Sequence, residues 1–245
     1  MKYGKLEQAL ENSVSSACAG KKAVNVLFSG GLDSSLIAFL ASKHCITHLY
    51  VAGMPNCFDF AQAKKTAFEM DWHLHEIVIQ KKEISKLKKD FERITKIKDN
   101  YNASLGIPIL ACAKHLQQKD VLSGLGADAL FAGFSHTKRI LEKEGEKDVE
   151  ADLRVSIESA KKDFERDSRI LKHFGKQLHA PFLDEKVIVE AFCIPAREKV
   201  KTPQDELRKW PLREIAKELK LPEMVWKAKK KALQYGSGVE KELRD

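Results

Sequence analysis

The sequence lacks the features that mark membrane, secreted and disulfide-stapled proteins. No apolar run in its 245 residues approaches the length needed to span a bilayer. The first residues, MKYGKLEQALENS, do not show the charged-then-apolar pattern of a signal peptide. Its five cysteines are odd in number and form no CxxC pair, which argues against a disulfide framework, a zinc ribbon and an iron–sulfur site. We therefore expect reduced thiols, no membrane partner and a cytoplasmic protein.

The signals of a nucleic-acid-binding module are also missing. The net charge is +8, which by itself is compatible with a nucleic-acid partner. However, no aromatic-interleaved basic patch or known binding motif accompanies that charge. A lysine- and glutamate-rich surface, with some excess for a polyphosphate ligand, explains it more simply. The composition therefore favours a small-molecule site over a nucleic-acid partner.

Short apolar segments alternate with helical segments in the first half of the chain. The pattern predicts strands at 23–28, 46–53, 74–79 and 120–124, and helices at 5–19, 34–43, 59–70 and 81–98. Strands that alternate with helices of about a dozen residues imply right-handed crossovers. The predicted fold class is therefore α/β, an open, mostly parallel twisted sheet with helices on both faces.

The second half of the chain has a different pattern. Residues 142–150, EKEGEKDVE, are charged and poor in apolar side chains, which predicts a surface loop or a mobile lid. From about 150 onward the sequence reads as helical, interrupted by five prolines. We accordingly assign 1–140 to an α/β core and 141–245 to a helical part that completes the same site.

A glycine-rich interruption, SGGLDSS, divides the apolar stretch VLFSGGLDSSLIAFL. A turn of this kind between a strand and a helix gathers backbone N–H groups at a helix N-terminus, which suits phosphate. Gly30 and Gly31 let the backbone approach a ligand closely. Asp33 would repel phosphate unless a cation lay between them, which indicates Mg²⁺. The hydroxyl groups of this turn belong to Ser29, Ser34 and Ser35.

Two commoner phosphate loops do not fit this turn. The sequence contains no GxxxxGK followed by Ser or Thr, and the glycine spacing fails the dinucleotide pattern GxGxxG. The remaining alternative is an ordinary strand–turn–helix with a serine cap. Without a ligand, an acid and four small residues in a buried turn would only destabilise the fold, which argues against this alternative.

The turn matches SGGxDS and resembles the pyrophosphate loop of the N-type ATP pyrophosphatases. The segment LSGLGADALFAGF (122–134) resembles the SGEGADELFGGY segment of the asparagine synthetase family. This resemblance implies an adenine nucleotide α-hydrolase-like fold and an ATP that is cleaved between its α- and β-phosphates. It also implies Asp128 as a second Mg²⁺ ligand opposite Asp33, with Ser123 and Gly124 against the AMP moiety.

The resemblance extends to further residues. It places Phe28, Ala52 and Met54 beside adenine. The segment KWPLREIAKELKLP puts Lys209 at the family's catalytic lysine, and KKKALQYGSG puts Lys230 toward the departing pyrophosphate. The structural alternatives are that Lys209 is a surface lysine and that Lys230 belongs to a solvated basic helix end.

Several positions depart from the family pattern. Leu125 replaces the glutamate of SGEGADE, Ala129 replaces the next glutamate, and Gln177 and His179 stand for Glu and Arg before PFLD. Leucine has no lone pair with which to hold an ammonium or accept its proton. The residue after the initiator methionine is Lys2 and not the cysteine of a glutaminase domain. We therefore expect free ammonia, another amine or a separate amidotransferase subunit as the nitrogen source.

Three functions remain open at this point. The first is an AMP- and pyrophosphate-forming amide ligase that uses Mg²⁺-ATP and a carboxylate substrate, aspartate or related. The second is a tRNA-modifying relative, and the third is an ATP-binding relative without transfer activity. His73 and His75 were also considered as metal ligands, since an HxH pair in a strand shares one face, but no third ligand is evident.

Overall fold

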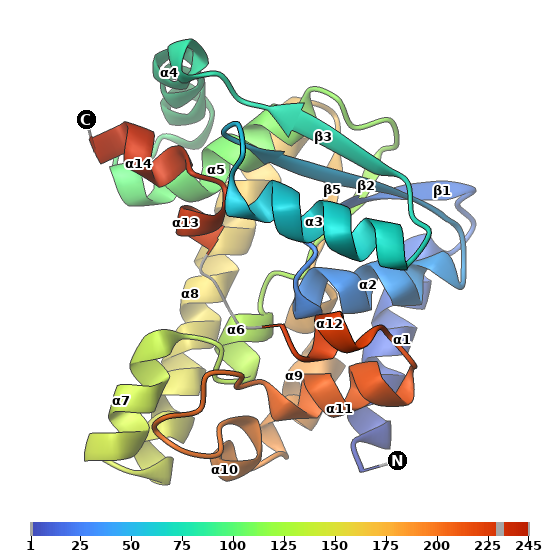
Figure 1. The fold of residues 1–245 in the computed structure, drawn as a ribbon, viewed down its shortest axis with the longest axis vertical. Helices are drawn as coiled ribbons and strands as arrows, with labels where there is room; N and C mark the ends of the chain where they lie inside the picture. Colours follow the sequence, from blue (N-terminus) through green and yellow to red (C-terminus); the bar gives the residue numbers. More distant parts are fainter. Residues whose placement is uncertain (1, 229–232, 245) are drawn as a thin grey trace.

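A five-stranded, all-parallel sheet forms the centre of the protein (Figure 1). The computed structural model describes residues 2–228 and 233–244. The sheet has the order β3-β2-β1-β4-β5, so the chain first builds outward from β1 and then crosses to its other side. The strands are β1 (Ala23–Leu27), β2 (Ile46–Gly53), β3 (Leu74–Val78), β4 (Asp120–Leu122) and β5 (Gln177–His179).

Successive side chains of the central strands enter two separate cores. Leu49 and Val51 of β2 belong to one hydrophobic cluster, whereas Tyr50 and Ala52 belong to the other. This alternation follows from the two-residue repeat of a strand, and burial on both faces is typical of parallel sheets. The sequence AVNVL of β1 is apolar on both faces for this reason, apart from Asn25, whose amide donates to the carbonyl groups of Gln118 and Asp120.

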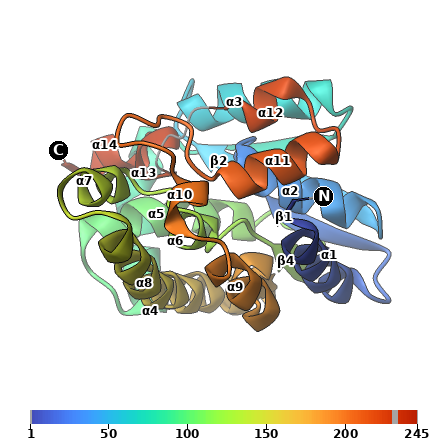
Figure 2. The same cartoon turned by 90° about the horizontal axis from the view of Figure 1, so that it is seen from below.

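Helices cover both faces of the sheet. Figure 2 shows α11 running beside α2, which it contacts, and α9 lies against α1. The first face is covered by α1 (Gly4–Cys18), α2 (Leu32–Ser42), α3 (Phe58–Glu69), α9 (Glu185–Phe192), α11 (Trp210–Glu218) and α12 (Glu223–Trp226). The second face is covered by α4 (Ile84–Thr95), α5 (Asn100–Ala113), the end of α8 (Glu146–His173) and α14 (Val239–Arg244).

The remaining elements are short. They are α6 (Ala127–Leu130), α7 (Ser135–Lys143), α10 (Ala196–Lys199), α13 (Leu233–Gly236) and the 3₁₀ turns η1 (Lys81–Glu83) and η2 (Pro181–Leu183). A small third core of Ala132, Val149, Leu153, Ala196 and Val200 packs beneath the segment that follows α6. The segment after α6 is thereby held by α8 and α10, in addition to the sheet contacts of β4.

The predicted fold class is confirmed, with two local corrections. Residues 177–179 were expected in a helical region but form β5, which pairs with β4 through Val121 and Leu178. Three residues with polar ends carry no alternation signal, so this strand depends on its neighbour. Residues 142–150 were expected as a loop or lid, but α7 and α8 cover them except at Glu144 and Gly145. Gly145 has a φ of +96°, which breaks the helix at a single point.

Among the described residues, none of the helices is both long enough and apolar enough to cross a membrane. None of the five cysteines forms a disulfide. The division of the chain near residue 140 stays a prediction.

Substitution of Gly30 should test how tightly the glycine turn is packed. Gly30 has a φ of +72°, and a Cβ there would lie 2.6–2.7 Å from backbone atoms of Gln62 and Ala63 in α3. We expect Gly30→Ala to lower the free energy of unfolding by about 2–5 kcal/mol, because left-handed strain and overpacking add. Denaturant unfolding measures the difference.

The matched control is Gly20→Ala. Gly20 has the same φ of +72°, but a Cβ there would meet nothing within 4 Å. It should cost only the strain of about 1–2 kcal/mol. Equal losses in the two variants would show that the contact with α3 does not matter.

Candidate functional site

The site lies where the chain leaves the carboxyl ends of β1 and β4. These neighbouring strands mark the point at which the sheet order reverses, the usual place for ligands in open α/β sheets. The β1 turn runs through Ser29 to Gly31, and the β4 turn runs through Ser123 to Gly126. A Cβ at Gly124 would lie 3.0–3.1 Å from Asp33 and Ser34 atoms, so the two turns touch.

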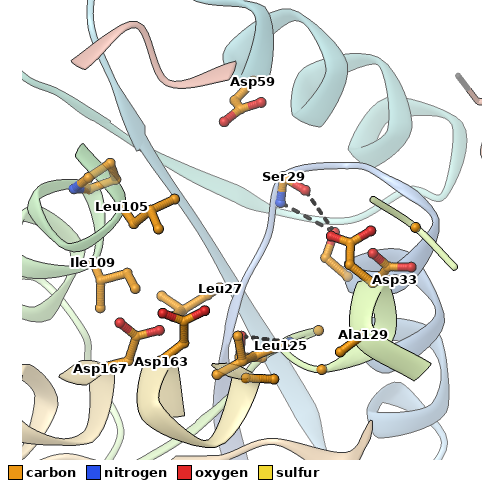
Figure 3. A pocket seen from close by; sticks show the side chains of 18 of the residues that line it. Leu27, Ser29, Asp33, Asp59, Leu105, Ile109, Leu125, Ala129, Asp163 and Asp167 are labelled. Atoms are coloured by element: carbon orange, nitrogen blue, oxygen red, sulfur yellow. Dashed lines mark hydrogen bonds between the residues drawn. The ribbon is translucent and has the colours of Figure 1, made fainter. Parts of the chain in front are cut away.

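A cavity of about 650 Å³ opens at this place. Both turns line it, together with side chains from β2, α5 and α8 (Figure 3). Of the residues predicted from the sequence, those that line it are Phe28, Ser29, Asp33, Ser34, Ala52, Ser123, Gly124 and Asp128. The structure thus gathers most of the predicted nucleotide-binding residues around one space.

The glycine turn is held from behind by α3. The Gly30 carbonyl accepts hydrogen bonds from Gln62 Nε2 (3.1 Å) and Thr66 Oγ1 (2.9 Å). The Ser34 hydroxyl accepts from the Ser29 N–H at 3.3 Å and lies 3.3 Å from the Ser29 hydroxyl (Figure 3). These bonds fix the turn before any ligand arrives, which lowers the entropy cost of binding.

Three predicted residues of this region do not line the cavity. Gly30 and Gly31 shape the turn from behind, and Gly31 is the residue that precedes α2. Ser35 is fully buried, and its hydroxyl has no hydrogen-bond partner among the described residues. Of the three serines, Ser29 and Ser34 are therefore the ones placed to meet a ligand.

Two carboxylates converge on a single ammonium beside the turn. Lys209 Nζ lies 2.5 Å from Asp33 Oδ2 and 2.7 Å from Asp128 Oδ1. Only 2% of Lys209 is exposed, so it is not a surface lysine. The three groups carry a net charge of about −1, and their close contact is far stronger here than in water. The predicted pair of aspartates therefore shares one cation.

The same arrangement suits Mg²⁺, which prefers oxygen ligands. Lys209 Nζ stands as a cation between the carboxylates, and Asp33 Oδ1 is buried with no hydrogen-bond partner among the described residues. An orphaned, negatively charged oxygen is costly unless a cation approaches it. The donor set therefore fits the predicted metal.

An unusual turn delivers Lys209 to the aspartates. Arg208 and Lys209 both have left-handed backbones, with φ values of 48° and 53°. Asp205 Oδ1 accepts from the N–H groups of Leu207 (2.9 Å) and Arg208 (3.0 Å). Burial alone would raise the pKa of Asp205, but its hydrogen bonds from Lys201, Arg208, Trp210 and Leu207 outweigh burial and lower it. The carboxylate therefore stays ionised and keeps the strained turn in place.

Arg213 braces the turn from the other side. Its Nε donates to the Arg208 carbonyl at 2.6 Å, and its terminal nitrogens donate to the carbonyls of Leu207, Trp226 and Ala228. Burial lowers the pKa of Arg213 to about 10. The group still carries its charge at neutral pH, so it ties Leu207 and Arg208 to Trp226 and Ala228.

The other end of the cavity is apolar and acidic. Figure 3 shows Leu105, Ile109 and Leu125 near Asp163 and Asp167, which project from α8. Burial raises the pKa of Asp167 to about 6, although its contact with Arg166 works against that rise. Residues 163, 166 and 167 share one helix face, and this i, i+3, i+4 spacing is the sequence signal that could have identified them.

Arg166 is already saturated by its own neighbours. Its guanidinium contacts Asp163 at 2.7 Å and Asp167 at 2.8 Å, and it donates to Asn102 Oδ1 at 2.9 Å. The group is 4% exposed. It therefore orders α8 against α5 and offers few donors to a ligand.

Some predicted positions lie away from the cavity. The Met54 N–H donates to the Ser237 carbonyl at 2.8 Å, and Met54 does not line the cavity. His179 pairs with Asp120 at 2.8 Å, and Gln177 is exposed at the sheet edge. These two departures from the family pattern therefore lie outside the site. Lys230 falls outside the described residues.

The histidines at the start of β3 contact other aromatic rings. The His73 and His75 ring centroids lie 4.6 Å apart in an edge-to-face arrangement, and the His75 ring stacks on Tyr50. Burial lowers the pKa of His75, with smaller effects from His73 and His48. Within the described ranges, no group of three or more His, Cys, Asp or Glu side chains could hold a metal ion.

Comparison with known proteins identifies one family. The sequence model described as Asparagine synthase matches residues 5–163 and 149–245. A Methanocaldococcus jannaschii protein that carries the name of a glutamine-hydrolysing asparagine synthetase is 33% identical over 96% of this chain and 50% of its own length. Asparagine synthetase B of Escherichia coli is 25% identical over 96% of this chain and 44% of its own length. The chain thus spans about half the length of these curated relatives.

A solved structure described as a predicted subunit of tRNA methyltransferase from Methanocaldococcus jannaschii also matches. It covers 85% of this chain at 18% identity with a TM-score of 0.37. This likeness is too slight to support a conclusion about function.

Removal of the Lys209 ammonium should expose the cation site. In Lys209→Gln the two carboxylates face each other without a charge between them, which should cost about 3 kcal/mol or more of unfolding free energy. Millimolar Mg²⁺ should then raise the unfolding midpoint of this variant more than that of the wild type, because binding to the folded state stabilises it. Thermal unfolding with and without Mg²⁺ measures both effects.

Lys217→Gln is the matched control, since Lys217 is exposed on α11. It should leave both the midpoint and the Mg²⁺ response unchanged. A Lys209→Gln variant that responds to Mg²⁺ no more than the wild type would contradict a shared cation site.

Proposed function

Because the chain belongs to the asparagine synthase family, we propose that it is an ATP-dependent amide ligase that releases AMP and pyrophosphate. The observation that carries the proposal is the convergence of Asp33 and Asp128 on one cation beside a glycine turn. A carboxylate substrate attacks the α-phosphorus of ATP, the bond to the β-phosphate breaks and pyrophosphate leaves. An amine then attacks the acyl carbon, and AMP leaves as the amide forms.

Each residue has a role in this scheme. The backbone and hydroxyl groups from Ser29 to Ser34 bind the phosphates, with Ser123 and Gly124 against the AMP moiety. Asp33 and Asp128 would hold Mg²⁺, which when bound neutralises part of the triphosphate charge. Lys209 is the catalytic lysine, a fixed cation that stabilises the charge developing at the α-phosphate. Phe28 and Ala52 border the adenine side of the cavity.

The acyl and amine substrates would meet at the Leu125 end of the cavity. Leu125 and Ala129 line it, so neither position supplies a carboxylate that could take a proton from an incoming amine. A carboxylate such as aspartate is the first acyl candidate. The nitrogen source would be free ammonia, another amine or a separate amidotransferase subunit.

An acid-dependence assay tests the proposal. Carboxylic acids, aspartate first, are screened with Mg²⁺-ATP and ammonium for AMP and pyrophosphate. Asp33→Asn should lower pyrophosphate release at least about 100-fold, because a metal-binding carboxylate is lost. Asp90→Asn, in an exposed ion pair on α4, is the control and should behave as the wild type. Release at the wild-type rate by Asp33→Asn would end the proposal.

Replacement of Leu125 tests the second half-reaction. Leu125→Glu should raise ammonium-dependent amide formation at least about 10-fold, since a positioned base contributes roughly 10²–10⁴ in rate. Leu125→Gln has a similar shape without a basic carboxylate and should give no such gain. Equal rates in the two variants would show that another group already takes the amine proton.

A further inference from the structure

The Arg208 side chain lines the cavity, and its Nε has no hydrogen-bond partner among the described residues. Arg208 is 6% exposed, and its Nε is buried without a hydrogen bond. No ion pair or side-chain hydrogen bond joins its guanidinium to any residue that the structure describes. A buried guanidinium N–H that lacks an acceptor is expensive, and the Arg208 Nε is in that position. No sequence motif points to this residue.

The acids near Arg208 are already engaged. Asp128 lies close enough to attract it, but that carboxylate contacts Lys209 at 2.7 Å. Asp205 accepts four hydrogen bonds, from the backbone of Lys201, Leu207 and Arg208 and from the Trp210 indole. Burial lowers the pKa of Arg208, and the two carboxylates only partly offset this. The positive charge is therefore held at the cavity wall, where these two carboxylates compensate it only in part.

The backbone maintains this costly arrangement. Two successive left-handed residues, Arg208 and Lys209, cost on the order of 1–3 kcal/mol each unless the surroundings fix them. Asp205 and Arg213 do so through hydrogen bonds to both sides of the turn. Of the two adjacent cations on this turn, Arg208 lines the cavity, whereas Lys209 contacts the carboxylates of Asp33 and Asp128.

The charges of the site indicate the kind of ligand that would complete it. Asp33, Asp128 and Lys209 sum to about −1, and Arg208 brings the group to neutrality. A Mg²⁺-polyphosphate is still an anion, so it requires a further positive group. A guanidinium binds phosphate oxygens through two parallel N–H donors, which an ammonium cannot do. At the opposite end of the cavity, Asp163 and Asp167 would repel such an anion.

We propose that Arg208 binds the pyrophosphate portion of the nucleotide and holds it as it separates from AMP. This inference rests on the proposed function in taking a Mg²⁺-polyphosphate as the ligand. Arg208 differs in role from Lys209: it would contact the leaving group, and Lys209 would act at the α-phosphate.

Binding titrations test the inference without any turnover. Mg²⁺-pyrophosphate, the Mg²⁺ complex of α,β-methylene-ATP and AMP are each titrated by calorimetry into the wild type, Arg208→Gln and Arg208→Lys. Arg208→Gln should weaken pyrophosphate and the ATP analogue about 10- to 100-fold, because charge-assisted hydrogen bonds are lost. AMP affinity should not change. Arg208→Lys should lose less affinity than Arg208→Gln, since lysine keeps the positive charge but lacks the two parallel N–H donors of a guanidinium.

The control is Arg93→Gln, whose side chain is exposed on α4 and pairs with Asp90. It should match the wild type with every ligand. Thermal unfolding of each variant identifies a folding defect, and Arg208→Lys keeps the test valid if Arg208→Gln does not fold.

Three results would overturn the inference. The first is an unchanged affinity for pyrophosphate in both Arg208 variants, and the second is an equal loss for AMP and pyrophosphate. If the variants instead weaken only a carboxylic acid, titrated in the presence of the ATP analogue, the guanidinium serves the acyl substrate and the inference is wrong. A wild type that binds neither pyrophosphate nor the analogue would contradict the proposed function itself.

Discussion

The contact of Lys209 with Asp33 and Asp128 is the constraint on which the rest of the site depends. The three side chains come from the start of α2, from α6 and from the residue before α11, segments far apart in the sequence. Charges taken out of water are stable only when their partners are close and well oriented. The contact therefore holds three helix starts together, and two of them, with Asp33 and Asp128, line the cavity.

The sequence predicted the parts of the molecule that are locally encoded. The β1 strand, the turn after it and the helix α2 could be predicted directly from the sequence. The glycines and the acid interrupt an apolar stretch, and this interruption by itself indicates a strand, a turn and a helix. Asp128 and Lys209 could be placed only through a family resemblance. Arg208 could not be identified, because the sequence LRKWPLR does not predict two successive left-handed residues, and these direct its side chain to the cavity. Strand β5 was missed because its pairing with β4, and not its own composition, makes it a strand.

The two ends of the cavity have different chemistry. Near the glycine turn, small residues, paired carboxylates and buried cations meet the needs of a charged ligand. Beyond Leu125, apolar side chains adjoin acids whose nearest guanidinium, Arg166, is already occupied. A fold does not determine its substrate. Of the two cavity residues that depart from the family pattern, Leu125 belongs to the second end, whereas Ala129 lies beside Asp33 (Figure 3). Under the proposed function, the choice of acyl and amine substrates would therefore depend on a few side chains at that end.

The position of β5 at the sheet edge affects how the chain matures during synthesis on the ribosome. Until residues 177–179 emerge, β4 is the outermost strand, with its hydrogen-bonding groups open on one side. An unpaired edge of this kind invites association with other chains. Asp33 and Asp128 likewise remain without Lys209 until it is translated, some 80 residues after Asp128. Both the β4 edge and the two carboxylates therefore obtain their partners only from the last third of the chain.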